Sequence, residues 1–442
     1  LSLILGTWAT GFGIFSMPSE AMLQIQPYFE FYPALQTIGF LAMFKILMIA
    51  GDVMAALLVR WMIMYFTNDE KKANAGFALL FLSPIVLVES SIHGMFDIYC
   101  GLLSLMSIYF VLNKRYAFAG MSWAIATLFK IFPAYLFPVL IAFILREYKG
   151  DWKVAAKSIA IAAIAALSIF IILYLPQILN GTFLDSWEFL IGRVFKAGSS
   201  PEKLIKIAIV GVIGIVVLVA GFVFLRRKVH ITYRPKPLTA KKSIAIMLSM
   251  VVVVFALLAL VNGGITNLFS NLFHTSYIVG IAVQGIAMIV AIVLGYKMYN
   301  SNWEDRAKLL LMVGTLAIAT CFLWVPMPEY LILLLPLISV YALVYDRRYI
   351  TPFLFISIGA TIFIIMVEGP AALFVSVAQY TDLIDISLVL DITEFYTGSV
   401  GLGDYSILQL IFCAIGAGTQ LIGVIMLFVY RFNPYRLEDE AI

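Results

Sequence analysis

The chain has 442 residues, of which 63% are hydrophobic and 12% are charged, and its formal net charge is +4. Soluble globular domains carry about 25% charged residues, so this composition excludes a soluble protein and predicts a polytopic membrane protein. The net charge is too small to indicate nucleic-acid binding, and no nucleic-acid partner is expected. All three cysteines fall inside apolar runs, where a thiol behaves as a small hydrophobe, so no disulfide is expected.

Nearly every apolar run is long enough to span a bilayer, and the runs lack the alternation typical of membrane β-strands. We therefore predict an all-α fold with about 12–14 transmembrane helices in a single multi-pass domain over residues 1–442. The first run is slightly short for a span, so we expect that sequence before Leu1 is missing or removed. In chain order, helices are expected at about 1–17, 37–65, 75–90, 92–112, 116–130, 132–146, 154–178, 204–225, 243–261, 276–297, 307–323, 328–345, 350–367 and 406–430.

Loop charges predict which side of the membrane each loop faces. Residues 226–242 carry seven Lys or Arg and no acid, which marks them as cytoplasmic. Counting the predicted spans places the loop from Arg146 to Lys153 on the same side of the membrane. Residues 368–404 carry six acids and no base, which indicates the opposite, outer side. The predicted outer loops are 18–36, 179–203 and 368–405.

A group of polar residues from Ser90 to Asp97 interrupts the apolar sequence. An unbroken helix over 75–112 would be about 57 Å long at about 1.5 Å per residue, nearly twice the thickness of the hydrocarbon core. We therefore expect a break here and a new helix from about Ser91, with Ser90 or Ser91 as its cap and free N–H groups that favour an anion. His93 and Asp97, four residues apart, would then share a helix face as an acid/base pair.

Other charged residues also lie in or beside the predicted spans. A charge at bilayer depth costs roughly 2.5–3.5 kcal/mol, so each one is expected to have a partner or a function. Glu89 lies one turn before His93 and is the expected partner of a nearby base. Lys130 is predicted to lie at the same depth as His93 and Asp97, near the outer face of the membrane. Two roles for Lys130 are equally favoured there, a salt bridge to Glu89 and binding of a phosphate.

Lys45 and Asp52 lie seven residues apart, too far to pair directly, and structural pairing with neighbouring helices is favoured over a substrate role. The sequence has no metal-binding, Walker or dinucleotide-binding pattern. No metal site and no cofactor are therefore expected, although the sequence leaves a divalent metal open.

The first third of the chain contains, in this order, the motifs Phe29-Glu30-Phe31-Tyr32-Pro33, Lys45 with Asp52, Ser83-Pro84, His93-Gly94-Met95-Phe96-Asp97 and Lys130-Ile131-Phe132-Pro133. Taken together and in this order, they resemble the GT-C superfamily of polytopic glycosyltransferases, which use polyprenyl-phosphate-linked sugars. The resemblance covers about residues 20–140, and the segment from Pro328 to Pro336 is similar to a later element of the family. This sequence has Met95 where the family usually has Gln, Ala34 in place of a second Pro, and no Asp in the first outer loop.

The resemblance implies an inverting transferase with a catalytic carboxylate in the first outer loop and basic groups that hold the lipid phosphate. It implies a GT-C-like catalytic module over 1–146, with additional transmembrane helices over 147–442. The expected catalytic residues are Glu20, Glu30 and Asp97, with Glu20 or Glu30 as the base. The expected substrate-binding residues are His93, Lys130, Tyr330 and Arg193.

The expected function is transfer of a sugar, a hexose such as mannose, from a polyprenyl (dolichyl) phosphate carrier to an acceptor. The reaction would take place on the outer or lumenal face of a cell membrane or an ER-type membrane, with the lipid-linked donor and membrane lipids as partners. The alternatives are a secondary transporter, a lipid flippase, or a non-catalytic subunit of a membrane assembly. Because of the departures from the family pattern, an inactive relative of these enzymes is a further alternative. The sequence does not define the oligomeric state.

Overall fold

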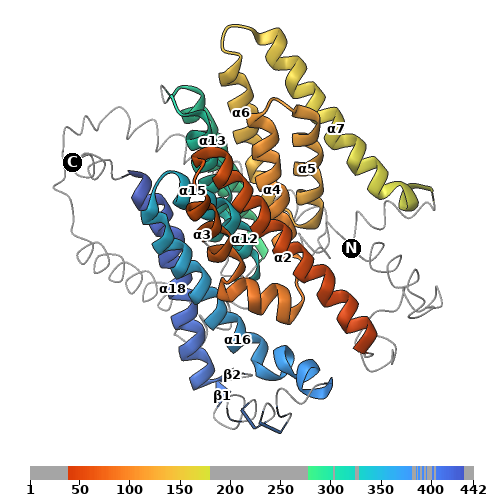
Figure 1. The fold of residues 1–442 in the computed structure, drawn as a ribbon, viewed down its shortest axis with the longest axis vertical. Coiled ribbons are helices and arrows are strands. Elements are labelled where there is room, and N and C mark those ends of the chain that lie inside the picture. The colour runs from red at the N-terminus through yellow and green to blue at the C-terminus, as the bar shows by residue number, and fades with distance from the viewer. Residues whose placement is uncertain are drawn as a thin grey trace, which may run out of the picture. The chain divides into compact units, whose positions relative to one another are not determined.

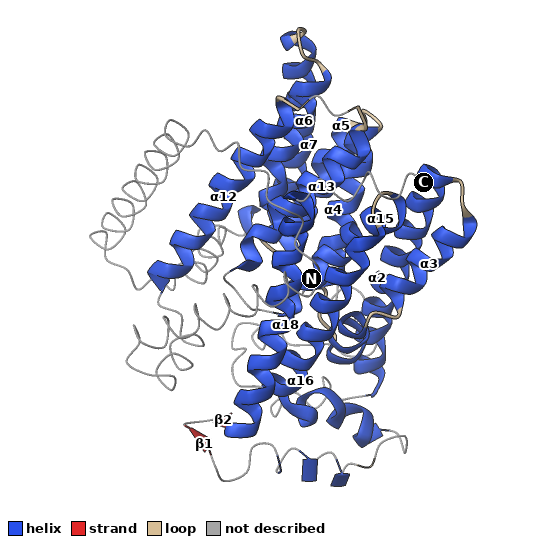
Figure 2. Ribbon diagram, turned by 90° about the vertical axis from the view of Figure 1, so that its left-hand side faces the viewer, coloured by secondary structure: helices blue, strands red, loops and turns tan. Residues whose placement is uncertain are grey.

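The computed structural model describes most of the chain between residues 38 and 432. The described residues are 38–179, 277–301, 304–323, 328–380, 385, 387–388, 391–392, 395, 401–402 and 405–432. Helices account for nearly all of them, as Figure 2 shows, and this confirms an all-α polytopic membrane protein. Strands β1 (Gly401–Leu402) and β2 (Tyr405–Ser406) form a short antiparallel pair, with Gly401 opposite Ser406.

Four helical segments within the described residues are long and apolar enough to cross a membrane. They are Lys45–Thr67, Trp152–Leu175, Arg347–Met366 and Ile411–Val429. A fifth span results if the bent pair Glu70–Phe81 and Val86–His93 crosses as one unit. The expected 12–14 spans include segments outside the described residues, so that number stays a prediction.

The chain divides into two compact units that interleave along the sequence. Unit 1 comprises Leu1–Met106, Ile125–Ile131 and Met327–Gly423, and unit 2 comprises Ser107–Ala124, Phe132–Pro326 and Val424–Ile442. Helices α4 (Asp97–Leu112), α5 (Tyr116–Phe129) and α18 (Ile407–Phe432) contribute residues to both. The division into a module over 1–146 and further helices over 147–442 stays a prediction.

Unit 1 is organised on the long helix α2 (Ile38–Thr67), which packs against α3 (Glu70–Phe81) and α15 (Leu335–Val344) (Figure 1). The chain turns between α2 and α3 at Asn68, whose φ is +50°. Asp69 then caps α3, because its carboxylate accepts hydrogen bonds from the backbone N–H groups of Lys71 and Lys72. The other helices of this unit are η4 (Val86–His93), α14 (Pro328–Leu331), η7 (Ile332–Leu334), η8 (Arg347–Tyr349) and α16 (Ile350–Tyr380).

Unit 2 is built around α6 (Phe137–Glu147), which packs against α7 (Trp152–Leu179) and α12 (Tyr277–Tyr299). The turn from α6 into α7 contains Gly150 at a φ of +103°, a conformation that other residues rarely adopt. Only 11% of the membrane-length window of α7 is buried. The unit also contains η5 (Phe132–Leu136), α13 (Arg306–Ala319) and η6 (Thr320–Leu323).

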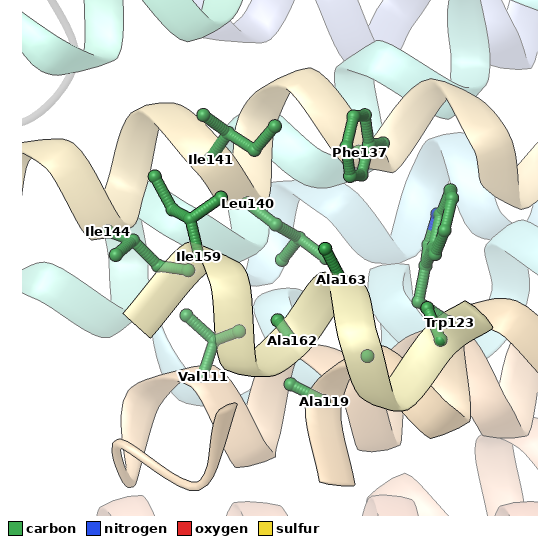
Figure 3. A pocket seen from close by; sticks show the side chains of 12 residues that line it. Val111, Ala119, Trp123, Phe137, Leu140, Ile141, Ile144, Ile159, Ala162 and Ala163 are labelled. Atoms are coloured by element: carbon green, nitrogen blue, oxygen red, sulfur yellow. The ribbon is translucent and has the colours of Figure 1, made fainter. Parts of the chain in front are cut away.

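A small cavity of about 30 Å³ lies between α5, α6 and α7 in unit 2, and Figure 3 shows its lining. Trp123 and Phe137 stack at one end with ring centroids 4.8 Å apart. The indole N–H of Trp123 donates to the carbonyl of Pro133 at 2.9 Å, so its polar atom is satisfied. The rest of the lining is aliphatic, and a cavity of this size and lining is expected to stay dry rather than to hold a ligand.

Glycine allows close packing of α16 against α18 in unit 1, and Figure 1 shows the two helices side by side. A Cβ atom on Gly416 would lie 2.7 Å from the Phe363 nitrogen and 2.8 Å from the Gly359 oxygen. We expect Gly416→Ala to push the helices apart and to destabilise the protein by about 1–3 kcal/mol, the usual cost of overpacking.

The matched control for this stability prediction is Gly418→Ala on the same helix, because a Cβ atom on Gly418 would meet nothing within 4 Å. The thermal unfolding midpoint of the detergent-purified protein should fall for Gly416→Ala only. Equal midpoints for the two variants would mean that the close approach does not contribute to stability.

Candidate functional site

The chain between α3 and α4 is broken at two places in unit 1. The first break contains Ser83 and Pro84, and the helices on either side of it are bent by 57°. Proline disfavours the helical conformation of the residue before it and has no N–H group to donate. Ser83 is held by a hydrogen bond of 2.6 Å to the hydroxyl of Ser357 on α16. The second break is at Gly94, whose φ of +94° ends η4 before α4 begins at Asp97.

Between these breaks the helix is wound as a π-helix, η4. The backbone N–H groups of Gly94 and Met95 both donate to the carbonyl of Glu89, at 3.1 and 2.9 Å. Long π-helical runs are rare, and short ones occur frequently at functional sites. The predicted break therefore exists, but it lies at Gly94, after His93, rather than before it.

The predicted helix start at Ser91 is wrong for this reason. Ser90 and Ser91 lie inside η4 and do not cap a new helix, and Asp97 is the first residue of α4. His93 and Asp97 consequently lie on two different helices, so they do not share a helix face as an acid/base pair. Each of them has a separate partner.

His93 pairs with Glu89 within η4, and this confirms the predicted role of Glu89 as the partner of a base. Nδ1 of His93 lies 3.1 Å from Oε2 of Glu89. The Glu89 side chain is only 1% exposed, whereas the His93 side chain is 24% exposed. The carboxylate behind the ring therefore fixes the orientation of the His93 imidazole and leaves its other edge toward the accessible side of the site.

Lys130 pairs with Asp97, and the described residues show no salt bridge from Lys130 to Glu89. Nζ of Lys130 lies 3.3 Å from Oδ1 of Asp97, which is fully buried, whereas the Lys130 side chain is 18% exposed. The ammonium also lies 4.2 Å from the ring centroid of Tyr330 and 5.3 Å from that of Phe96. Aromatic faces attract a cation, so these rings and the carboxylate hold the ammonium in one place.

Sequence reasoning did not find the aromatic residues that support this pair. The Phe129 ring packs against Phe96 at 5.6 Å and stacks on Tyr99 at 5.9 Å between centroids. The hydroxyl of Tyr99 donates to the carbonyl of Leu47 on α2 at 2.6 Å. Phe96 directly precedes Asp97 and Phe129 directly precedes Lys130 in the sequence. Their positions next to the two charged residues could have been used to predict them.

A third carboxylate, Asp52 on α2, is 1% exposed and accepts a hydrogen bond of 2.8 Å from the hydroxyl of Ser91. The predicted structural pairing of Asp52 with a neighbouring helix is confirmed. The bond ties α2 to η4 and so helps to fix the helix that carries Glu89 and His93. The corresponding expectation for Lys45 stays a prediction.

The pairs His93–Glu89 and Lys130–Asp97 share one arrangement, in which a buried acid lies behind a partly exposed base. Oε1 of Glu89 and Oδ2 of Asp97 have no hydrogen-bond partner within the described residues. Glu329 and Glu89 are close enough to Asp97 to repel its charge. Burial and repulsion both disfavour the Asp97 carboxylate, so its ion pair with Lys130 is what compensates the charge. The accessible side of the site is then positive and suited to a phosphate.

Three of the predicted site residues, Glu20, Glu30 and Arg193, lie outside the described residues, as do loop 18–36 and most of loop 179–203. The structure brings Asp97, Lys130 and Tyr330 together, and it places His93 on η4 beside Glu89. Among the side chains that the structure describes, no three or more from His, Cys, Asp and Glu are grouped so that they could hold a metal ion.

Residues 27–204 match the family model of the GPI transamidase subunit PIG-U. The chain is also similar to the dolichyl pyrophosphate Glc1Man9GlcNAc2 alpha-1,3-glucosyltransferase of Kluyveromyces lactis. The identity is 27% over 145 residues, which cover 29% of this chain and 25% of the relative. The chain thus resembles membrane glycosyltransferase-like proteins.

Both similarities are partial. The family match covers less than half of the chain, and the alignment spans about a quarter of the length of the curated relative. No solved structure matches the chain. The expected relation to dolichyl-linked glycosyltransferases is supported at this coarse level, but mannose specificity is not, because the relative is a glucosyltransferase.

Proposed function

We propose that the protein is a membrane glycosyltransferase that takes a hexose from a polyprenyl-phosphate carrier and that Lys130 binds the phosphate of this donor. The observation that carries the proposal is the Lys130 ammonium, held 3.3 Å from the buried Asp97 carboxylate while its side chain keeps partial exposure. A cation fixed in this way can contact an anion without having to be ordered first. The similarity to a dolichyl-linked glucosyltransferase supports the same reaction class.

In the proposed reaction, a carboxylate accepts the proton of the acceptor hydroxyl, and the hydroxyl oxygen attacks the anomeric carbon from the face opposite the phosphate. The bond between that carbon and the phosphate oxygen breaks with inversion, and the polyprenyl phosphate leaves with both electrons. Negative charge grows on the leaving phosphate, where Lys130 and an N–H group of His93 stabilise it. Tyr330 and Arg193 are proposed to complete the donor site.

Asp97 is proposed to act as a positioning residue in this scheme. Its side chain is fully buried, and its nearest charged group is the Lys130 ammonium. A carboxylate in that place orients the Lys130 side chain but has no route to an acceptor hydroxyl. The proton-accepting base is therefore proposed to be Glu20 or Glu30, on the outer or lumenal face of an ER-type membrane.

The direct test uses purified protein in liposomes that contain polyprenyl-phosphate mannose or polyprenyl-phosphate glucose. Release of free polyprenyl phosphate is measured by mass spectrometry after addition of lipid-linked oligosaccharide acceptors. One of the two donors should be consumed only when acceptor is present. Absence of release with both donors across the acceptor panel would contradict the proposed enzyme activity.

A second candidate is a non-catalytic subunit of a membrane assembly, and the PIG-U match over residues 27–204 favours it. In that case the Lys130 site would bind a lipid phosphate without transferring a sugar. Partner proteins that co-purify with the chain, together with lipid-phosphate binding and no donor turnover, would favour this candidate. The transporter and flippase alternatives gain no support from either comparison.

A further inference from the structure

Unit 2 contains an open groove of about 830 Å³ between α6, the start of α7 and α12. This volume is in the range of about 300–1,000 Å³ that is typical of ligand sites. Most of the wall is apolar, and the glycine and polar side chains lie at the end where α6 turns into α7. The lining residues are Phe137, Pro138, Ile141, Ala142, Leu145, Tyr148, Lys149, Gly150, Trp152, Ala155, Met288, Ile292, Tyr296 and Tyr299.

The polar end of the groove has the composition of a membrane–water interface. Trp152 and Tyr296 are 72% and 68% exposed, and Nζ of Lys149 lies 5.3 Å from the ring centroid of Tyr299. Exposed Trp and Tyr gather at the level of the lipid headgroups, and Lys extends toward the same level. The apolar length of the groove leads away from this level along α6 and α12.

The charges at this end favour an anion. The nearby acids are engaged, because Glu147 pairs with Arg306 and a carboxylate oxygen of Asp151 accepts a hydrogen bond from the backbone N–H of Val154. Within the described residues, Lys149 has no salt bridge to an acid. A second cation is close by, because Nζ of Lys114 lies 5.8 Å from the ring centroid of Tyr148.

We propose that this groove binds one anionic phospholipid of the bilayer, with its phosphate at Lys149 and an acyl chain along the apolar wall formed by α6 and α12. A lipid fits better than a protein segment, because the groove combines an apolar wall with a cation at the headgroup level. The neighbouring helix α7 is also mostly unburied, with 11% of its membrane-length window buried. The site is independent of the proposed transferase activity and does not use Lys130 or Asp97.

Native mass spectrometry of the detergent-purified full chain tests the proposal, with palmitoyl-oleoyl phosphatidylglycerol and phosphatidylcholine as probes. The wild type should bind phosphatidylglycerol with an affinity about fivefold higher than its affinity for phosphatidylcholine. This ratio is the effect expected from about one lysine next to an anionic lipid headgroup. Lys149→Glu and Lys149→Gln should abolish this preference. The groove-filling variant Ile292→Trp should lower the affinity for both lipids.

Lys297→Glu is the matched control, because Lys297 is an exposed lysine on α12 that does not line the groove. It should leave the preference unchanged, and the thermal midpoints show which variants remain folded. Equal retention of the two lipids by the wild type would overturn the proposal, as would equal effects of Lys149→Gln and Lys297→Glu. Displacement of phosphatidylglycerol by stoichiometric polyprenyl phosphate would also overturn it, in favour of a donor site.

Discussion

Replacement of Lys130 by Met is expected to lower donor turnover by about 10²–10³-fold, the usual loss when one preorganised group that stabilises the leaving charge is removed. Lys130→Arg should keep part of the activity, because it retains the charge next to Asp97 although its planar head does not reproduce the ammonium. The measurement is the initial rate of polyprenyl phosphate release at saturating donor. Lys72→Met is the control, because Lys72 is a partly exposed lysine of α3 that also pairs with an acid, Asp69, at 3.9 Å.

The same variant tests whether Asp97 depends on Lys130. Without the ammonium, a fully buried carboxylate loses its ion-pair partner, and breaking such a pair costs about 3–5 kcal/mol. The double variant Asp97→Asn/Lys130→Met should therefore unfold at a higher temperature than Lys130→Met alone, but it should remain inactive. Full activity in either variant would contradict phosphate binding by Lys130. If the double variant melts no higher than Lys130→Met, the two side chains are not coupled.

Local sequence signals predicted most of the described helices. The helix expected at 116–130 is α5 at Tyr116–Phe129, and the helix expected at 276–297 is α12 at Tyr277–Tyr299. Long apolar runs bounded by charged or polar residues define such helices without any tertiary information. The expected helix at 75–90 is instead α3 followed by η4, because Pro84 breaks it. A π-helix has no comparable sequence signal, so its i→i+5 bonds could not be predicted.

The contacts of the candidate site also divide into those that the sequence could predict and those that depend on the tertiary fold. Glu89 and His93 are four residues apart, so their pairing follows from local helix geometry and could be predicted. Lys130 and Asp97 are on different helices, and the sequence left Glu89 open as the partner of Lys130. The start of α4 at Asp97 decides between them, and this start depends on the left-handed conformation of Gly94. The Tyr330 ring comes from a still more distant segment, and only the fold brings it to Lys130.

Glu20→Gln or Glu30→Gln is expected to lower kcat by about 10²–10⁴-fold, the usual contribution of a general base, with little change in donor affinity. The reason is the state of the other carboxylates near the site. Asp52, Glu89 and Asp97 are at most 1% exposed, and they are engaged by Ser91, His93 and Lys130. None of these three is placed to accept a proton from an incoming hydroxyl.

Glu329 provides the decisive comparison, because it is partly exposed and lies close enough to Asp97 to act on its charge. Glu329→Gln should reduce kcat far less than the glutamine variant of the true base in the first loop. Single-turnover rates with pre-bound donor separate the chemical step from donor binding and are measured for all three variants. If Glu329→Gln alone abolishes that rate, the base lies beside Tyr330 and not in the segment 18–36. If none of the three changes it, transfer does not use a carboxylate base from either segment.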